Sequence, residues 1–233
     1  MVTSPLDHLD ELVGAQAEFL AAIGEVDPTT PVPWCGSWHV RELVVHLAGV
    51  HHWAAAQARG TAETPLEQGP FTLEELYREC AGELRDTLVG LGPDAVGSTL
   101  LGPGPASFWR RRQLHETIVH LWDLRTAGGL GLDVRPEVWA DTVDEVVTVM
   151  QPRQVRLHRM PRLPSPIELV ASDVDRGWRL ETAHDGPAVV QVRAPASVLA
   201  LILWGRRSPD DVEVEVSGDG AALHAALAEP LTP

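Results

Sequence analysis

Hydrophobic residues recur at every third or fourth position through the first two-thirds of the chain, which is the period of amphipathic helices. In the first such segment the apolar positions are Leu6, Leu9, Val13, Leu20 and Ile23. Ser4 is expected to cap this helix, with Pro5 in its first turn, Asp7 completing a box-like start, and Gly24 ending it.

The same period predicts four further helices. The first runs from about Trp38 to residue 59 and ends at Gly60, and the second opens at Thr72 with a capping box and runs to about residue 88. The third contains residues 110–124 and ends at the glycine pair 128–129, and the last runs from Pro136 to about Gln154. Helices of this length joined by modest loops indicate an antiparallel four-helix bundle.

The pattern changes after residue 158. The stretch RMPRLPSP carries prolines at positions 161, 164 and 166, which no helix crosses. Strand-like runs then alternate with short apolar helices; the strand runs are IELVAS, GWRLET, AVVQVRA and VEVEVSG, and the helical runs are SVLALILWG and AALHAALAE. We therefore predict two domains, a helical bundle over residues 1–160 and a small α+β domain over residues 166–233.

Charge and composition exclude several classes of partner. The 233 residues carry a formal net charge of −15 with an isoelectric point near 5.0, which argues against nucleic acid, because phosphate binding needs a basic surface. No apolar run reaches the roughly 18 residues of a membrane span, and the acidic N-terminus does not read as a signal peptide. Cys35 and Cys80 form neither a disulfide framework nor a zinc knuckle. A cytoplasmic protein without a membrane partner is expected, and a monomer is compatible with the sequence.

One helix carries a polar pair on the face where a core helix is normally apolar. Glu116 and His120 are four residues apart in RRRQLHETIVHLWDL, so they share a helix face, whereas His115 points elsewhere. His46 lies on the apolar side of the helix at residues 38–59 and is expected to point into the bundle. Two histidines and one carboxylate are typical of catalytic zinc with an open position, and the same set could hold iron, nickel or manganese. Spacing alone equally allows a hydrogen-bonded Glu–His pair and a satisfied core histidine at position 46.

Two longer motifs resemble a known family. CGSWHVRELVVHLAGVHHW and RRRQLHETIVHLWDL resemble the second- and fourth-helix signatures of the mycothiol-dependent maleylpyruvate isomerase family, whose first domain is a DinB-like metal-binding bundle. IELVASDVDRGWRL and APASVLALILWGRRSPDDVEVEVSGD resemble its sterol-carrier-like second domain. The resemblance implies that His46, Glu116 and His120 are the metal ligands. His39 departs from the pattern, because the family often has threonine there, and it either forms the first turn of the helix or lines the mouth of the pocket.

The resemblance also implies a chemistry. The family uses mycothiol as cosubstrate with a divalent metal, zinc first among the candidates, to carry out cis–trans isomerisation or thiol transfer on a small, electrophilic and anionic substrate. Arg206 in the motif WGRR matches a family arginine of the substrate pocket and is the candidate catalytic residue. The alternative is a non-catalytic DinB-like module that binds a metal or a small molecule; a third possibility treats the second domain alone as a lipid carrier.

Several neighbouring residues have candidate supporting roles. Asp123, three residues after His120, is expected either to orient the imidazole of that histidine or to pair with an arginine. The arginines at positions 110–112 suit carboxylate recognition or a solvated helix edge, and not all three can face inward. Trp53 and Trp109 are candidates to line a cleft, whereas Cys35 and Cys80 are expected to be inert.

Overall fold

The computed structural model describes residues 6–66, 69–184 and 186–233, and the chain divides into two compact units, one ending at Leu132 and the other beginning at Asp133. The predicted fold class, a helical bundle followed by a small α+β unit, is confirmed. Among the described residues, no helix combines the length and hydrophobicity needed to span a membrane.

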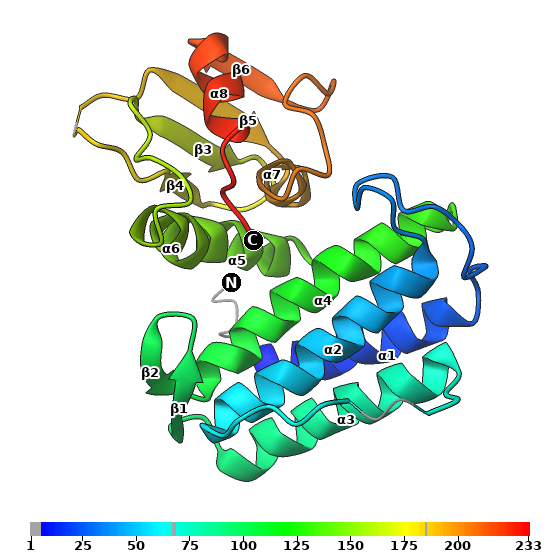
Figure 1. Ribbon diagram of the computed structural model, residues 1–233. Coiled ribbons are helices and arrows are strands. Elements are labelled where there is room, and N and C mark those ends of the chain that lie inside the picture. The colour runs from blue at the N-terminus through cyan, green and yellow to red at the C-terminus, as the bar shows by residue number, and fades with distance from the viewer. Residues whose placement is uncertain (1–5, 67–68, 185) are drawn as a thin grey trace. The chain divides into compact units, whose positions relative to one another are not determined.

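The first unit contains four long helices (Figure 1). They are α1 (His8–Ile23), α2 (Val40–Arg59), α3 (Leu73–Leu91) and α4 (Ser107–Ala127). The predicted caps account for most of the boundaries: Thr72 and Glu75 form the capping box of α3, and Gly60 ends α2 in the left-handed conformation. Asp7 is the N-cap of α1 and accepts hydrogen bonds from two backbone amides, whereas the predicted roles of Ser4 and Pro5 fall outside the described residues.

The bundle is not a simple up-and-down arrangement. Along α2 and α3, His52 and Arg59 both contact Glu83, and Arg59 also donates to Thr87 further along, so these consecutive helices run in the same direction. Helices α2 and α4 run in opposite directions, because His51 contacts Gln113 and Trp53 contacts the earlier residue Trp109. The segment between α2 and α3 must therefore cross the length of the bundle.

His52 connects the segment between α2 and α3 to α3. Nδ1 of His52 lies 2.5 Å from a carboxylate oxygen of Glu83, and its Nε2 lies 2.7 Å from the carbonyl oxygen of Thr64 in the crossing segment. Although burial opposes the change, these two contacts raise the pKa of His52, because both neighbours are acceptors and only the imidazolium donates from both nitrogens.

The core of the first unit lies between the four helices. Phe19, Leu43, Leu47, Tyr77 and Leu121 are among its fully or almost fully buried side chains. Burial of these side chains is the main favourable term that holds α2 and α4 together. The core thereby fixes the rotation of both helices and which of their polar side chains face each other.

A hairpin that the sequence analysis did not predict precedes α4. Its strands are β1 (Val96–Thr99) and β2 (Gly102–Pro105). Gly97 lies so close to the end of α2 that a Cβ there would come within 2.3 Å of the carbonyl oxygen of Ala58. The indole of Trp109, which is almost fully buried, donates to the carbonyl of Ser98 at 2.7 Å. Trp109 therefore anchors the hairpin to α4 and does not line a cleft.

The second unit begins with one continuous helical segment. It consists of α5 (Pro136–Glu145), a π-helical turn η1 (Val146–Met150) and α6 (Gln151–Arg156). Pro152 has no amide hydrogen to donate to the preceding turn, which accounts for the π-helical interruption just before it. The helix predicted over residues 136–154 is therefore present, but it is not regular.

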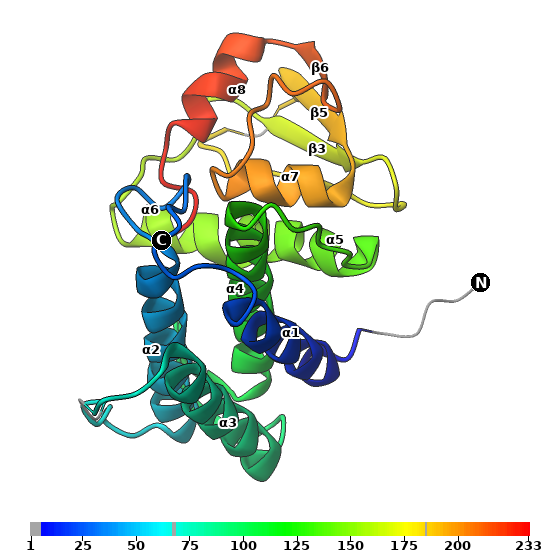
Figure 2. The same cartoon turned by 90° about the vertical axis from the view of Figure 1, so that its right-hand side faces the viewer.

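A four-stranded sheet follows. Its strands are β3 (Ile167–Ala171), β4 (Gly177–Arg179), β5 (Val190–Ala194) and β6 (Glu215–Gly218), in the order β4-β3-β5-β6. Only β3 and β5 are parallel, with Leu169 opposite Val192. Helices α7 (Ala196–Leu203) and α8 (Gly220–Leu227) complete the unit, and α7 lies between α5 and the sheet (Figure 2).

The division between the units differs from the predicted domain ranges of 1–160 and 166–233. The structure groups α5 and α6 with the sheet, because α5 packs against α7, and α7 packs against β3 and β5. The proline-rich stretch does interrupt the helix, but it lies inside the second unit. An amphipathic helix looks the same in sequence whichever unit it covers, so its packing partner could not be read from the periodicity.

Candidate metal centre

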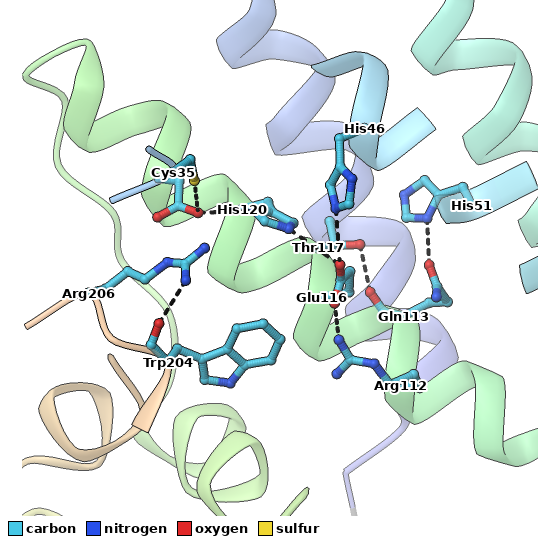
Figure 3. A network of polar contacts seen from close by, with 11 residues as sticks. Cys35, His46, His51, Arg112, Gln113, Glu116, Thr117, His120, Trp204 and Arg206 are labelled. Carbon is cyan, nitrogen blue, oxygen red and sulfur yellow. Dashed lines mark hydrogen bonds and ion pairs between the residues drawn. The ribbon is translucent and has the colours of Figure 1, made fainter. Parts of the chain in front are cut away.

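The antiparallel contact between α2 and α4 brings the three predicted ligands together. Nε2 of His120 lies 3.3 Å from Oε1 of Glu116, and Nε2 of His46 lies 3.7 Å from the same oxygen. The rings of His46 and His120 are 5.2 Å apart at their centroids and almost perpendicular. The ligand atoms of the three residues all lie within 4.8 Å of one another. His46 and Arg112 approach Glu116 from opposite sides (Figure 3).

These separations match those required by a tetrahedral metal ion. Zinc binds histidine nitrogen and carboxylate oxygen at roughly 2.0–2.2 Å, so neighbouring ligand atoms of a tetrahedron lie about 3.3–3.6 Å apart. The two contacts to Oε1 of Glu116, 3.3 and 3.7 Å, are close to that spacing. The three side chains could therefore hold a divalent metal, and they supply the nitrogen and oxygen donors that such an ion prefers.

Asp123 orients His120, one of the three predicted ligands. Its Oδ2 lies 3.0 Å from Nδ1 of His120, and the carboxylate is fully buried. Nδ1–H then donates to Asp123, which leaves the lone pair of Nε2 directed toward Glu116 and His46. The thiol of Cys35 also donates to Oδ2 of Asp123, at 3.7 Å. Of the two roles expected for Asp123, the structure shows the orientation of His120.

The three consecutive arginines do not act alike. Arg112 is 4% exposed and its guanidinium bonds to Oε2 of Glu116, the oxygen on the other side of the carboxylate from the histidines. Arg110 donates to the carbonyl of Leu88 at 2.8 Å and so ties α4 to the end of α3. Sequence reasoning missed the contact between Arg112 and Glu116, although their separation of four residues on one helix is the signal that would have found it.

A second buried network lies beside the three predicted ligands. Nδ1 of His51 lies 2.8 Å from the side-chain oxygen of Gln113, and the hydroxyl of Tyr77 lies 3.4 Å from its Nε2. Burial lowers the pKa of His51 to about 4 and raises the pKa of Tyr77 well above its ordinary value. His51 is therefore neutral at physiological pH, with Nδ1 as donor and Nε2 as acceptor. Sequence reasoning also missed this network, because it depends on three different helices.

The remaining predicted residues have simpler positions. His39 is the N-cap residue of α2, where its amide donates to Glu42 at 2.9 Å, which is the first-turn role that the sequence left open. Trp38 packs against His46 with ring centroids 4.8 Å apart. Cys80 is buried, and its burial raises the thiol pKa to about 11, so it is not activated as a nucleophile.

Arg206 belongs to the second unit and lies three residues after the end of α7. Gly205, in the left-handed conformation, turns the chain so that the amide of Arg206 donates to the carbonyl of Leu201 at 2.7 Å. The guanidinium donates to the carbonyl of Trp204 at 2.7 Å and lies 5.9 Å from the centre of that indole ring. These contacts define its place in the second unit, and its catalytic role stays a prediction.

Known proteins provide an independent comparison with these observations. Residues 9–125 match the family described as Mycothiol maleylpyruvate isomerase N-terminal domain, and residues 137–225 match the MDMPI C-terminal domain. The two matches flank the division between Leu132 and Asp133. No curated protein matches the chain.

Two crystal structures share the fold of the chain. They are the mycothiol-dependent maleylpyruvate isomerase and a mutant of that enzyme in which a histidine is replaced by alanine, with TM-scores of 0.66 and 0.67. Both are 16% identical to this chain in sequence, and each alignment covers 91% of this chain and 93% of the other. At this level of identity the similarity concerns the fold.

Proposed function

Because the chain belongs to the mycothiol maleylpyruvate isomerase family, we propose that it is a metal- and thiol-dependent isomerase in which His46, Glu116 and His120 hold one divalent ion, zinc first among the candidates. The observation that carries the proposal is the distance of both histidine Nε2 atoms from one oxygen of Glu116, 3.3 and 3.7 Å. A site meant only to satisfy a buried histidine would not need three converging ligands.

The three side chains suit the activation of a thiol. Once bound, a divalent metal would stabilise the thiolate form of mycothiol at neutral pH. Two of the three protein ligands are neutral imidazoles and only Glu116 is anionic, so the ligand set leaves a positive charge for an incoming thiolate. Asp123 keeps His120 in the tautomer that presents Nε2, and therefore keeps the set assembled.

The reaction class that follows is reversible thiol addition to a small unsaturated acid. Addition of the sulfur to a conjugated cis double bond leaves a single bond, rotation about that bond and elimination of the thiol give the trans isomer, and no atom is gained or lost. Arg206 would bind a carboxylate of the substrate through paired donors. Transfer of the same thiol to an electrophile is the related reaction that these residues could also support. A reducing compartment such as the cytoplasm suits a thiol cosubstrate.

The decisive test is metal analysis combined with thiol binding. Purified protein should contain one divalent ion per chain, and His46→Ala should lose most of it, because two ligands then remain. Cobalt-substituted protein should develop a sulfur-to-cobalt charge-transfer band on addition of mycothiol. Arg206→Ala should retain the metal and the band while losing turnover. Full metal content in His46→Ala would refute the ligand assignment. Turnover that does not depend on thiol would refute the thiol mechanism and favour a hydrolase instead.

A further inference from the structure

The two oxygens of Glu116 have different partners. Oε1 faces Nε2 of both histidine ligands, whereas Oε2 is bonded to Nη2 of Arg112, one helical turn earlier on α4. We propose that Arg112 is a positioning residue that occupies Oε2, so that Glu116 offers the metal a single oxygen and one coordination position stays open for the thiol. This inference rests on the metal- and thiol-dependent function proposed above.

Denticity matters because the site has few ligands. A carboxylate can bind a metal through one oxygen or through both, and a second oxygen from Glu116 would occupy the position that a thiol needs. A guanidinium is planar and presents fixed N–H donors that match a carboxylate edge, so it competes with the metal for Oε2. Arg112 is suited to this role because it is 4% exposed, so water competes little with its contact to Glu116.

The positive charge of Arg112 should also favour binding of the thiolate. A divalent metal with Glu116 would keep a single positive charge, which a bound thiolate would just neutralise. The guanidinium of Arg112 adds a positive charge directly beside Glu116. Removing it should therefore weaken binding of the anionic thiolate more than binding of the metal, which is attracted by the carboxylate that Arg112 partly neutralises.

The neighbouring arginine provides a matched control. Arg110 lies on the same helix and is partly buried, but its guanidinium donates to the carbonyl of Leu88, away from Glu116. A general effect of removing a cation from the start of α4 should therefore appear in both positions. An effect on the coordination of the metal should appear only at position 112.

The experiment uses the full chain loaded with cobalt, in the wild type and in the variants Arg112→Met, Arg112→Lys and Arg110→Met. Metal stoichiometry, the visible cobalt spectrum and mycothiol affinity from the charge-transfer band are measured. Arg112→Met should keep one cobalt per chain and show the weaker visible bands of a higher coordination number. It should also bind thiol at least tenfold more weakly, since removing a group that supports a metal ligand typically costs roughly 10–100-fold. Arg112→Lys, which keeps the charge without the planar fork, should fall between it and the wild type, and Arg110→Met should match the wild type.

The outcomes separate this inference from the proposed function. A wild-type spectrum and wild-type thiol affinity in Arg112→Met would overturn the inference and leave the proposed function standing, as would a folded Arg112→Met that binds no metal. If Arg112→Met fails to fold, Arg112→Lys decides: a spectrum and a thiol affinity equal to those of the wild type would again overturn the inference. Absence of metal or of the thiol band from the wild type would refute the proposed function, and this inference with it.

Discussion

We predict that protonation of one buried histidine, His51, lowers the free energy of unfolding at acidic pH. His51 is fully buried, is hydrogen-bonded to Gln113 and Tyr77, and has a pKa of about 4 in the folded protein. In the unfolded chain the pKa of histidine returns to about 6.5. Between these two values the unfolded chain binds a proton that the folded chain does not. Stability therefore rises with pH across this interval, is complete above about 6.5, and is lost as the pH falls toward 4.

The magnitude follows from the two pKa values. Their difference of about 2.5 corresponds to a maximum of about 3.4 kcal/mol at 1.36 kcal/mol per pKa unit, reached below pH 4. At pH 5 the loss relative to pH 7.5 is about 2 kcal/mol by the same relation. A loss of that size is a large part of the stability of a typical domain, about 5–15 kcal/mol.

The substitution His51→Gln tests this calculation. Glutamine retains a donor and an acceptor but does not titrate, so the variant should lose stability at pH 7.5 and then lose less than the wild type on acidification. The free energy of unfolding is measured in urea by circular dichroism from pH 7.5 to 5 on metal-free protein, and the wild-type advantage should fall by about 2 kcal/mol across that range. His224→Gln, at a side chain that is 53% exposed, is the control and should follow the wild-type curve.

A wild-type advantage over His51→Gln that stays constant from pH 7.5 to 5 would refute the reasoning. It would mean that His51 keeps its ordinary pKa in the folded protein, and therefore that the network with Gln113 and Tyr77 is open to water.

Three further predictions concern other parts of the first unit. Asp123→Asn should weaken metal binding about 10–100-fold in competition with a chelator, because a neutral amide replaces the carboxylate that orients His120, and unchanged affinity would contradict that role. Gly97→Ala should lower the free energy of unfolding by about 1–3 kcal/mol, because the added Cβ would overlap the backbone of α2. The control Gly14→Ala, where the added Cβ on α1 has open space, should raise the free energy of unfolding by up to about 1 kcal/mol. His52→Gln should destabilise the protein more at pH 6 than at pH 8. The raised pKa of His52 contributes stability that is complete below about 6.5 and is lost as the pH rises through the folded pKa. An equal loss of stability at both pH values in urea unfolding would argue against an imidazolium at this position.

Local signals in the sequence determined most of the elements. The period of apolar positions and the caps at Thr72 and Gly60 predicted the helices of the bundle to within a few residues, because each signal acts over one or two turns of the chain. The strand-like runs IELVAS and AVVQVRA likewise predicted β3 and β5. The pair of Glu116 and His120 was visible from its spacing and His46 from its place on an apolar helix face, and the family resemblance implied that all three are metal ligands.

Only the tertiary structure decided the rest. Which unit α5 joins, the parallel course of α2 and α3, and the packing of Gly97 against α2 all depend on contacts between residues far apart in sequence, which no local pattern encodes. The same holds in part for the site: spacing placed Arg112, Glu116 and His120 on one face of α4, but the packing of α2 against α4 is what brought Nε2 of His46 to the oxygen of Glu116 that His120 also faces. The sequence determines which side chains each helix carries on a given face, and the packing of the core determines which of those faces meet.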